Sequence, residues 1–107
     1  MFYKREMKGY LSAIEGVKQK TLVYGDKTLM TEFVLEEGSD LPIHSHPHEQ
    51  TGYLVSGKLK MFIGEEAFTV EPGDSWCIKS NESHGAQAIE DSVAVEIFSP
   101  VRTEYIP

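Results

Sequence analysis

The chain has 107 residues, 40% of them hydrophobic, and a formal net charge of −7 at pH 7. This length allows one domain, spanning residues 1–107, with a modest core, and is too short for two. The acidic balance argues against nucleic acid and anionic membranes as partners, and no apolar run is long enough to cross a bilayer. The N-terminal segment lacks the apolar stretch of a signal peptide, so we expect a soluble, cytoplasmic protein.

Short strands separated by turn residues are predicted along the whole chain, and no stretch shows helical periodicity. The segment 29–35 alternates, so Leu29, Thr31, Phe33 and Leu35 should share one face of a strand. Many short strands with regular turn signals predict an all-β barrel or sandwich. The expected strands are residues 16–24, 29–35, 51–56, 58–63, 67–70, 75–78, 85–89 and 93–98.

The single cysteine, Cys77, cannot form a disulfide within the chain. Its neighbours Trp76 and Ile78 are apolar, a context that is typical of a buried structural thiol. We therefore predict that Cys77 is buried and unreactive, and that Trp76 belongs to the core.

Three of the four histidines fall within five residues, in the segment His44-Ser-His46-Pro-His48-Glu-Gln50. In an extended segment, residues i and i+2 point to the same face, so His44 and His46 can aim two imidazoles at one point. With the remote His84 and the amide of Gln50 they form a plausible site for a divalent metal. Taken alone, the segment is equally compatible with a polar loop that exposes its histidines.

The spacing of this segment resembles the first signature motif of the cupin family. That motif is a glycine, five residues, His-x-His, three or four residues, a glutamate, six residues and a second glycine. Here it is Gly38, SDLPI, His44-Ser-His46, PHE, Gln50, TGYLVS and Gly57. The departure is Gln50 in place of the usual glutamate. Glu49 is one residue too early and would point to the opposite face of a strand.

The second cupin motif is matched further along the chain, between residues 73 and 88. Lys79 stands where the family has proline, and Asn81 stands where it has glycine. Asparagine tolerates a positive φ better than most residues, so the turn can survive this change. His84 is in register, and Ala88 replaces the final asparagine of the motif. The two motifs together imply a double-stranded β-helix, which is a small jelly-roll barrel.

The resemblance implies a metal site in the barrel, held by His44, His46, Gln50 and His84. Such a first shell is entirely neutral, which disfavours hard cations such as Mg²⁺ and Ca²⁺. One divalent transition metal, Zn, Ni, Fe or Mn, is therefore expected, and the sequence does not choose among them. His48 is expected to be a non-ligand, either a substrate contact at the cavity rim or an exposed loop histidine.

The last predicted strand carries Glu96 and Phe98 on one face, and Val93, Val95 and Ile97 on the other. If the valine face were the core, Glu96 would be solvated. If instead a partner covers the valine face of a barrel, Glu96 and Phe98 face the cavity. Glu96 could then act as a general acid or base, and Arg102 could bind a substrate carboxylate through two hydrogen bonds.

The tail from Glu96 to Arg102 is similar to that of the small cupins of pectin and alginate degradation, the KdgF type. This resemblance implies opening of the ring of 4,5-unsaturated uronates to the linear keto form. The aspartate, phenylalanine and arginine of that group correspond to Glu96, Phe98 and Arg102. Glutamate for aspartate moves the carboxyl group by about 1.5 Å, and a misplacement of this size can cost about 10²-fold in rate.

Three hypotheses for the function follow from these residues. The first is a metal-dependent enzyme that acts on a small anionic sugar or sugar acid. The second is a cupin oxygenase, which Gln50 in place of glutamate weakly disfavours. The third is a non-catalytic module that binds a sugar or another small molecule.

A homodimer is also predicted from the sequence. The apolar face formed by Val93, Val95 and Ile97 needs a cover in a closed barrel. The first ten residues have no obvious place in a minimal barrel, and they could add to the sheet edge of a partner.

Overall fold

The computed structural model describes residues 1–107, and its regular secondary structure is almost entirely β-strand. A short 3-10 turn, η1 (Thr103–Tyr105), is the one helical element. The strands are β1 (Leu11–Ile14), β2 (Val17–Tyr24), β3 (Leu29–Leu35), β4 (Asp40–His44), β5 (Glu49–Ser56), β6 (Leu59–Ile63), β7 (Glu66–Val70), β8 (Ser75–Ile78), β9 (His84–Ala88) and β10 (Ser92–Ser99).

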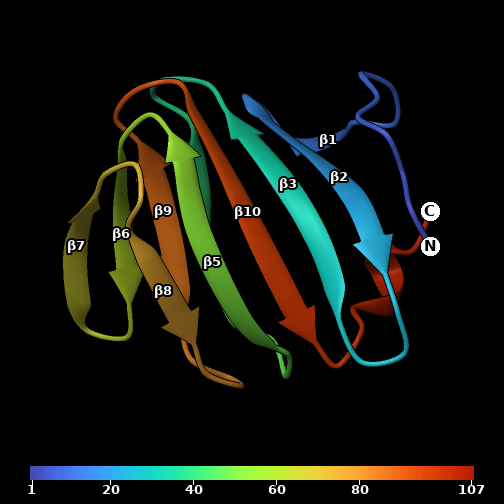
Figure 1. The fold of residues 1–107 in the computed structure, drawn as a ribbon. Coiled ribbons are helices and arrows are strands. Elements are labelled where there is room, and N and C mark those ends of the chain that lie inside the picture. Colours follow the sequence, from blue (N-terminus) through green and yellow to red (C-terminus); the bar gives the residue numbers. More distant parts are fainter.

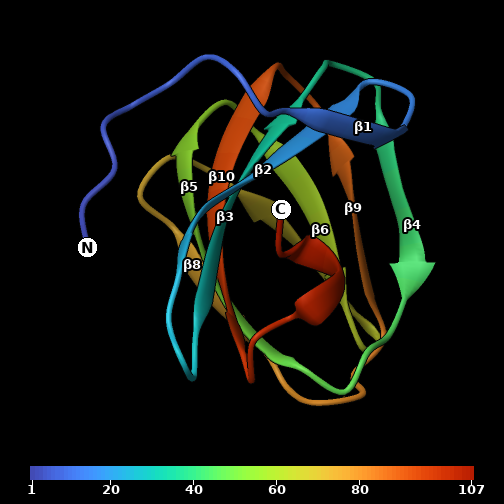
Figure 2. The same ribbon diagram turned by 90° about the vertical axis from the view of Figure 1, so that its right-hand side faces the viewer.

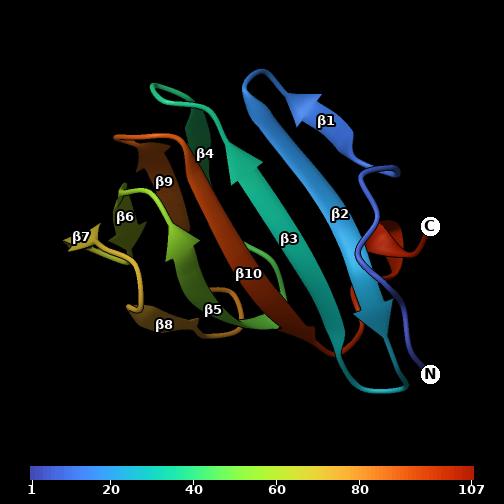
Figure 3. The ribbon, with the colours of Figure 1, turned by 45° about the horizontal axis from the view of Figure 1, so that its top comes forward.

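Two antiparallel sheets face each other across the core (Figures 1 and 3). The larger sheet has the strand order β1-β2-β3-β10-β5-β8, and the smaller one has the order β4-β9-β6-β7. Neighbouring strands come from distant parts of the chain, since β10 lies between β3 and β5. This architecture confirms the predicted all-β jelly roll, and the strand at residues 75–78 agrees with the prediction at both ends.

The core follows the period-2 alternation of the two central strands. Leu29, Thr31, Phe33 and Leu35 of β3 are all buried, whereas the residues between them are half-buried. The four therefore share one face of the strand, as the sequence predicted. On β10 the buried set is the one that contains Glu96 and Phe98. Burial of a phenylalanine side chain typically contributes about 1.5–3 kcal/mol, so Phe98 helps to hold the sheets together at the edge of the cavity.

The prediction of a buried thiol is wrong, because Cys77 is free and exposed. On β8 the side chains of Trp76 and Ile78 face inward, and alternation sends the side chain between them to the outer surface. The two apolar neighbours are therefore on the opposite face of the strand and give Cys77 no cover. Tyr53 also lies on the outer face, where 51% of it is exposed.

The outer face of the larger sheet carries Val93, Val95 and Ile97, all half-buried. Residues 1–10 precede the first strand, and they extend away from the two sheets (Figure 2). Two hydrogen bonds connect this segment to the larger sheet. The Tyr10 hydroxyl donates one to Glu32, and Lys20 Nζ donates one to the Glu6 carbonyl at 2.8 Å. The structure contains no helix that is long and apolar enough to cross a membrane.

Candidate metal centre and cavity

Three histidines converge at one end of the sandwich. His44 ends β4 and His84 begins β9, and the two residues are paired across these strands. His46 follows in the loop before β5. One ring nitrogen from each of the three lies within 4.8 Å of the others, which is a spacing that can hold a metal ion. The predicted convergence of His44 and His46 is thus present, with His84 added by strand pairing.

The backbone fixes the tautomer of each imidazole. Nδ1 of His44 lies 2.7 Å from the Pro42 carbonyl oxygen, Nδ1 of His46 lies 3.0 Å from that of His48, and Nδ1 of His84 lies 2.8 Å from that of Glu82. A carbonyl oxygen only accepts, so each Nδ1 must carry the proton and donate it. In the neutral ring the lone pair is then on Nε2, which is the arrangement that orients metal-bound histidines.

Two of these Nε2 atoms have no proton donor in reach. Nε2 of His84 is buried without any hydrogen-bond partner. Nε2 of His46 lies 2.9 Å from Oε1 of Gln50, so two acceptor atoms face each other. Buried acceptors without donors are rare in folded proteins. Their convergence fits a cation that is bound by His44, His46, His84 and the Gln50 oxygen.

Burial keeps the two inner imidazoles neutral. It lowers the pKa of His46, and the Arg102 guanidinium lowers it further. Burial is also the main cause of the lowered pKa of His84. Neutral imidazole is the form that binds metals, and an all-nitrogen and amide-oxygen set suits Zn, Ni, Fe or Mn better than Mg²⁺ or Ca²⁺.

The turn of the second motif is hydrogen-bonded to the loop that carries His46. Asn81 adopts a positive φ of 63°, as expected for a residue in the place of a glycine. Its N–H donates a hydrogen bond to the His46 carbonyl at 2.8 Å, and the Ser80 hydroxyl donates one to the Pro47 carbonyl at 2.6 Å. The departure from the cupin motif at residue 81 therefore leaves the turn intact.

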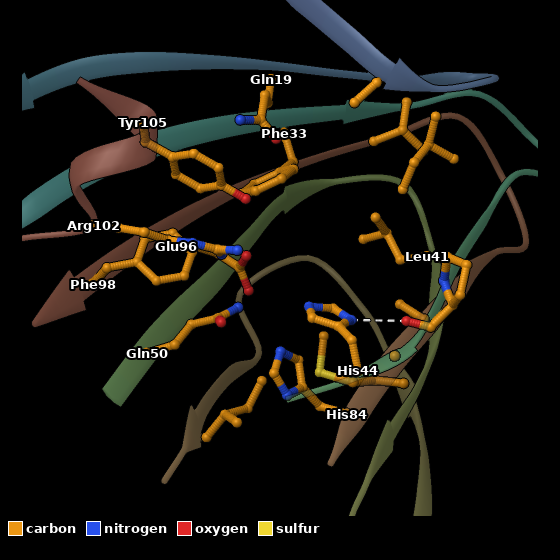
Figure 4. Close-up of a pocket in the computed structure, with 18 residues that line it drawn as sticks. Gln19, Phe33, Leu41, His44, Gln50, His84, Glu96, Phe98, Arg102 and Tyr105 are labelled. Atoms are coloured by element: carbon orange, nitrogen blue, oxygen red, sulfur yellow. Dashed lines mark hydrogen bonds between the residues drawn. The ribbon is translucent and has the colours of Figure 1, made fainter. Parts of the chain in front are cut away.

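A cavity of about 410 Å³ opens beside the histidines. Figure 4 shows His44, His84, Gln50, Glu96 and Arg102 directed into it. Apolar side chains also line the cavity, among them Val17 of β2, Phe33 of β3 and Leu41 of β4. The cavity therefore combines polar groups next to the candidate metal centre with an apolar part of its lining.

Glu96 is only 7% exposed, so the alternative of a solvated carboxylate on the outer face is wrong. The Trp76 indole Nε1 donates a hydrogen bond of 2.9 Å to Glu96 Oε1. Burial raises the pKa of Glu96, while Gln50, Trp76 and Arg102 oppose the rise. A buried carboxyl group next to a cationic side chain is a common feature of sites that move protons.

The predicted residues do not all reach the cavity. Those that line it are His44, Gln50, His84, Glu96, Phe98 and Arg102. His46 does not line it, and its ring lies 5.7 Å from that of Phe98, between centroids. His48 does not line it. Its ring lies edge-on to His46, 5.6 Å between centroids, and its carbonyl holds His46 Nδ1.

Sequence reasoning missed three residues of this site. The sequence predicts Trp76 in the core, and it does pack against the core, yet it also donates a hydrogen bond to Glu96. Gln19 and Tyr105 line the cavity from β2 and η1. The inward face of β2 could have identified Gln19, whereas no pattern indicates that the chain after Pro100 folds back over the cavity.

The comparisons with known proteins agree with this fold. The cupin domain model matches residues 31–100. The structure is similar to that of KdgF from Halomonas sp., with 25% identity, a TM-score of 0.93, and coverage of 99% of this chain and 100% of that one. An RmlC-like cupin from Shewanella frigidimarina has 22% identity and a TM-score of 0.92 over 98% of this chain and 95% of that one. A predicted oxalate decarboxylase from Thermotoga maritima has 18% identity and a TM-score of 0.75, covering 86% of this chain and 90% of that one.

A search of curated proteins found no match to this chain. The structures below 25% identity support the fold alone, while the domain model spans more than half of the sequence. The chain belongs to the cupin family.

Proposed function

We propose that this cupin uses a divalent transition metal to act on a small anionic sugar acid, and that it opens the ring of 4,5-unsaturated uronates to the linear keto form. The observation that carries the proposal is that a buried carboxyl group, Glu96, and a guanidinium group, Arg102, share one cavity with His44 and His84, two of the three clustered histidines. The likeness to the Halomonas KdgF over nearly the whole of both chains supports it.

A metal held by His44, His46, Gln50 and His84 would supply Lewis-acid polarisation of a substrate oxygen. The residues of the chain do the rest. Arg102 binds the substrate carboxylate and Phe98 supports the sugar ring from one side. His48 orients His46 through its carbonyl oxygen.

The reaction is an isomerisation, so no oxidant or water is consumed. The C1 hydroxyl loses its proton and becomes a carbonyl while the bond between C1 and the ring oxygen breaks. The ring oxygen gains a proton and becomes an enol hydroxyl, which then loses that proton as C4 gains one. Glu96 is the group that carries these protons within the cavity.

Glutamate at position 96 replaces the aspartate of KdgF-type cupins. Its longer side chain is held in one place, since Trp76 donates a hydrogen bond to its Oε1 and the residue is buried. We propose that the enzyme tolerates this change because Trp76 fixes where the carboxyl group lies.

The test is Glu96→Gln, which keeps the size of the side chain and removes the exchangeable carboxyl proton. Glu65→Gln, at an exposed turn position, is the matched control. We expect Glu96→Gln to lower kcat on 4,5-unsaturated galacturonate at least ~10²-fold, with the metal content unchanged. Loss of the ultraviolet absorbance of the conjugated alkene measures turnover. Unimpaired turnover in Glu96→Gln contradicts the proposed role.

The apolar part of the cavity lining favours a second candidate, a non-catalytic module that retains a small molecule. Val17, Phe33 and Leu41 offer no hydrogen bonds to a sugar hydroxyl from their side chains. Tight retention of a ligand without conversion would support this candidate. Oxygen consumption with a bound acid would instead indicate an oxygenase.

We also propose that the chain works as a single domain and as a homodimer in the cytoplasm. The half-buried face of Val93, Val95 and Ile97 would be covered by a second copy. The N-terminal residues, with Phe2 80% exposed, would complete the contact. A free, exposed thiol at Cys77 is compatible with a reducing compartment.

A further inference from the structure

The guanidinium group of Arg102 lies against two aromatic rings. Its Cζ is 4.2 Å from the centroid of Tyr105 and 5.1 Å from that of Phe98. The two rings are nearly perpendicular, with 5.5 Å between centroids. Phe98 is only 1% exposed and is fixed by the core. Contacts of this kind stabilise a cation and also restrict the plane of the guanidinium.

The second ring belongs to the C-terminal turn, and that turn is tied to the sheet. The Thr21 hydroxyl of β2 donates a hydrogen bond to the Tyr105 carbonyl. The Tyr105 N–H donates one to the Arg102 carbonyl at 2.9 Å. Tyr105 therefore lies at the wall of the cavity, as Figure 4 shows, rather than in solvent.

A third contact comes from outside the cavity. Arg102 Nε donates a hydrogen bond of 2.5 Å to Oε1 of Glu104. The side chain of Arg102 is 16% exposed and that of Glu104 is 56% exposed. Glu104 does not line the cavity, whereas Arg102 does. The carboxylate thus contacts the guanidinium on its solvent side.

This arrangement selects one of the two ways in which an arginine can bind a carboxylate. Nε carries one N–H, and the two terminal nitrogens carry four. Because the Nε proton of Arg102 is donated to Glu104, a second carboxylate cannot bind side-on to Nε and one terminal nitrogen. The end-on fork of the two terminal nitrogens is left for a carboxylate in the cavity.

We propose that Glu104 and Tyr105 are positioning residues that hold Arg102 so that its end-on fork faces the cavity. Glu104 occupies Nε, and Tyr105 fixes the guanidinium plane against Phe98. The inference rests on the proposed function only in so far as Arg102 binds the carboxylate of the substrate. It assigns to the segment 102–105 a role in affinity for anionic ligands.

The first experiment measures Arg102 itself and needs no substrate. The chain has two arginines, Arg5 in the exposed N-terminal segment and Arg102. A 1H–15N spectrum of the arginine Nε–H groups therefore contains two side-chain signals, which Arg102→Lys assigns. We expect the Arg102 Nε proton to exchange with water much more slowly than that of Arg5. Glu104→Ala and Tyr105→Leu should abolish this protection.

The second experiment measures kinetics of the zinc-loaded protein on 4,5-unsaturated galacturonate. A stack of this kind is worth roughly tenfold in affinity, so Tyr105→Leu should raise KM about tenfold, with kcat changed less than about threefold. Tyr105→Phe retains the ring and Glu104→Gln retains an acceptor oxygen, so both should stay near wild type. Rescue by these two variants separates positioning from a general loss of folding.

The outcomes distinguish this inference from the proposed function. If the Arg102 signal is protected and galacturonate, used as a non-reacting probe, binds in an Arg102-dependent manner without any turnover of the unsaturated sugar, the proposed function fails and the positioning role stands. If the Arg102 Nε proton exchanges as fast as that of Arg5, the positioning role is refuted. The same conclusion follows if Glu104→Ala and Tyr105→Leu leave both protection and KM unchanged.

Discussion

Gly52 permits the hydrogen bond between Trp76 and Glu96, and its replacement tests how the cavity is held together. Gly52 on β5 is paired with Trp76 on β8 and with Glu96 on β10. The indole lies directly across the glycine. A Cβ atom at position 52 would be 2.2 Å from Trp76 Cε2 and 2.3 Å from its Nε1. No real Cβ atom tolerates such contacts, so Gly52→Ala must displace the indole.

The cost of this displacement has two parts. Moving the ring breaks the hydrogen bond to a buried carboxyl group, which is worth about 1.5–3 kcal/mol. Forcing a methyl group into a packed interior typically costs about 1–3 kcal/mol. The loss of backbone freedom in the unfolded chain opposes these by about 0.4–1 kcal/mol. We therefore expect Gly52→Ala to lower the free energy of unfolding by about 3 kcal/mol.

Urea unfolding measures this effect well, because Trp76 is the only tryptophan and its fluorescence reports on the site. With an m-value of about 1–3 kcal/mol/M, the midpoint should fall by about 1–3 M. Gly25→Ala is the matched control, since a Cβ atom there meets nothing within 4 Å. That variant should be as stable as wild type or slightly more stable. A Gly52→Ala midpoint equal to that of Gly25→Ala would refute the reasoning.

Three further predictions concern the metal, the alkaline limit and the assembly. His84→Ala should lose the bound metal in elemental analysis while His48→Ala retains it, because His48 acts through its backbone carbonyl; equal retention by both contradicts the ligand set. Burial raises the pKa of Tyr105, so the neutral phenol stabilises the fold below its unfolded pKa of about 10, and this stability is lost as the pH rises through the folded pKa. Melting curves of wild type and Tyr105→Phe should therefore diverge in alkaline buffer, and parallel curves would count against burial of the hydroxyl. Val95→Glu, on the outer face, should convert a dimer to a monomer in light scattering, and a monomeric wild type would exclude the dimer.

The fold could be predicted because its information is local and periodic. Alternation along β3 and β10 predicted which residues share a face, and the spacing of the two cupin motifs identified the jelly roll. Alternation alone left open which face of β10 is buried. The convergence of His44 with His84 was predicted by resemblance, and it depends on the pairing of β4 with β9. Alternation along β8 places Cys77 on the outer face, whereas its apolar neighbours in the sequence indicate burial, and the structure follows the alternation.

The rest of the cavity depends on contacts that no local pattern encodes. Trp76 bonds Glu96 because β5 contributes a glycine between their strands. Tyr105 and Glu104 lie beyond the last strand, and their place is set by a hydrogen bond to Thr21, 84 residues earlier in the chain. Such long-range contacts leave no periodic signal in the sequence, so the tail could not be assigned beyond Arg102.

The three imidazoles are oriented by main-chain oxygens of residues 42, 48 and 82, and this has a consequence for how the protein can diverge. A carboxylate that orients a ligand can be deleted by a single codon change, whereas a carbonyl oxygen is present whatever side chain is encoded. Point substitutions at these three positions should therefore be tolerated as long as β4, which contains residue 42, and the two loops that contain residues 48 and 82 keep their paths. Insertions and deletions in the two loops are the changes that selection must remove.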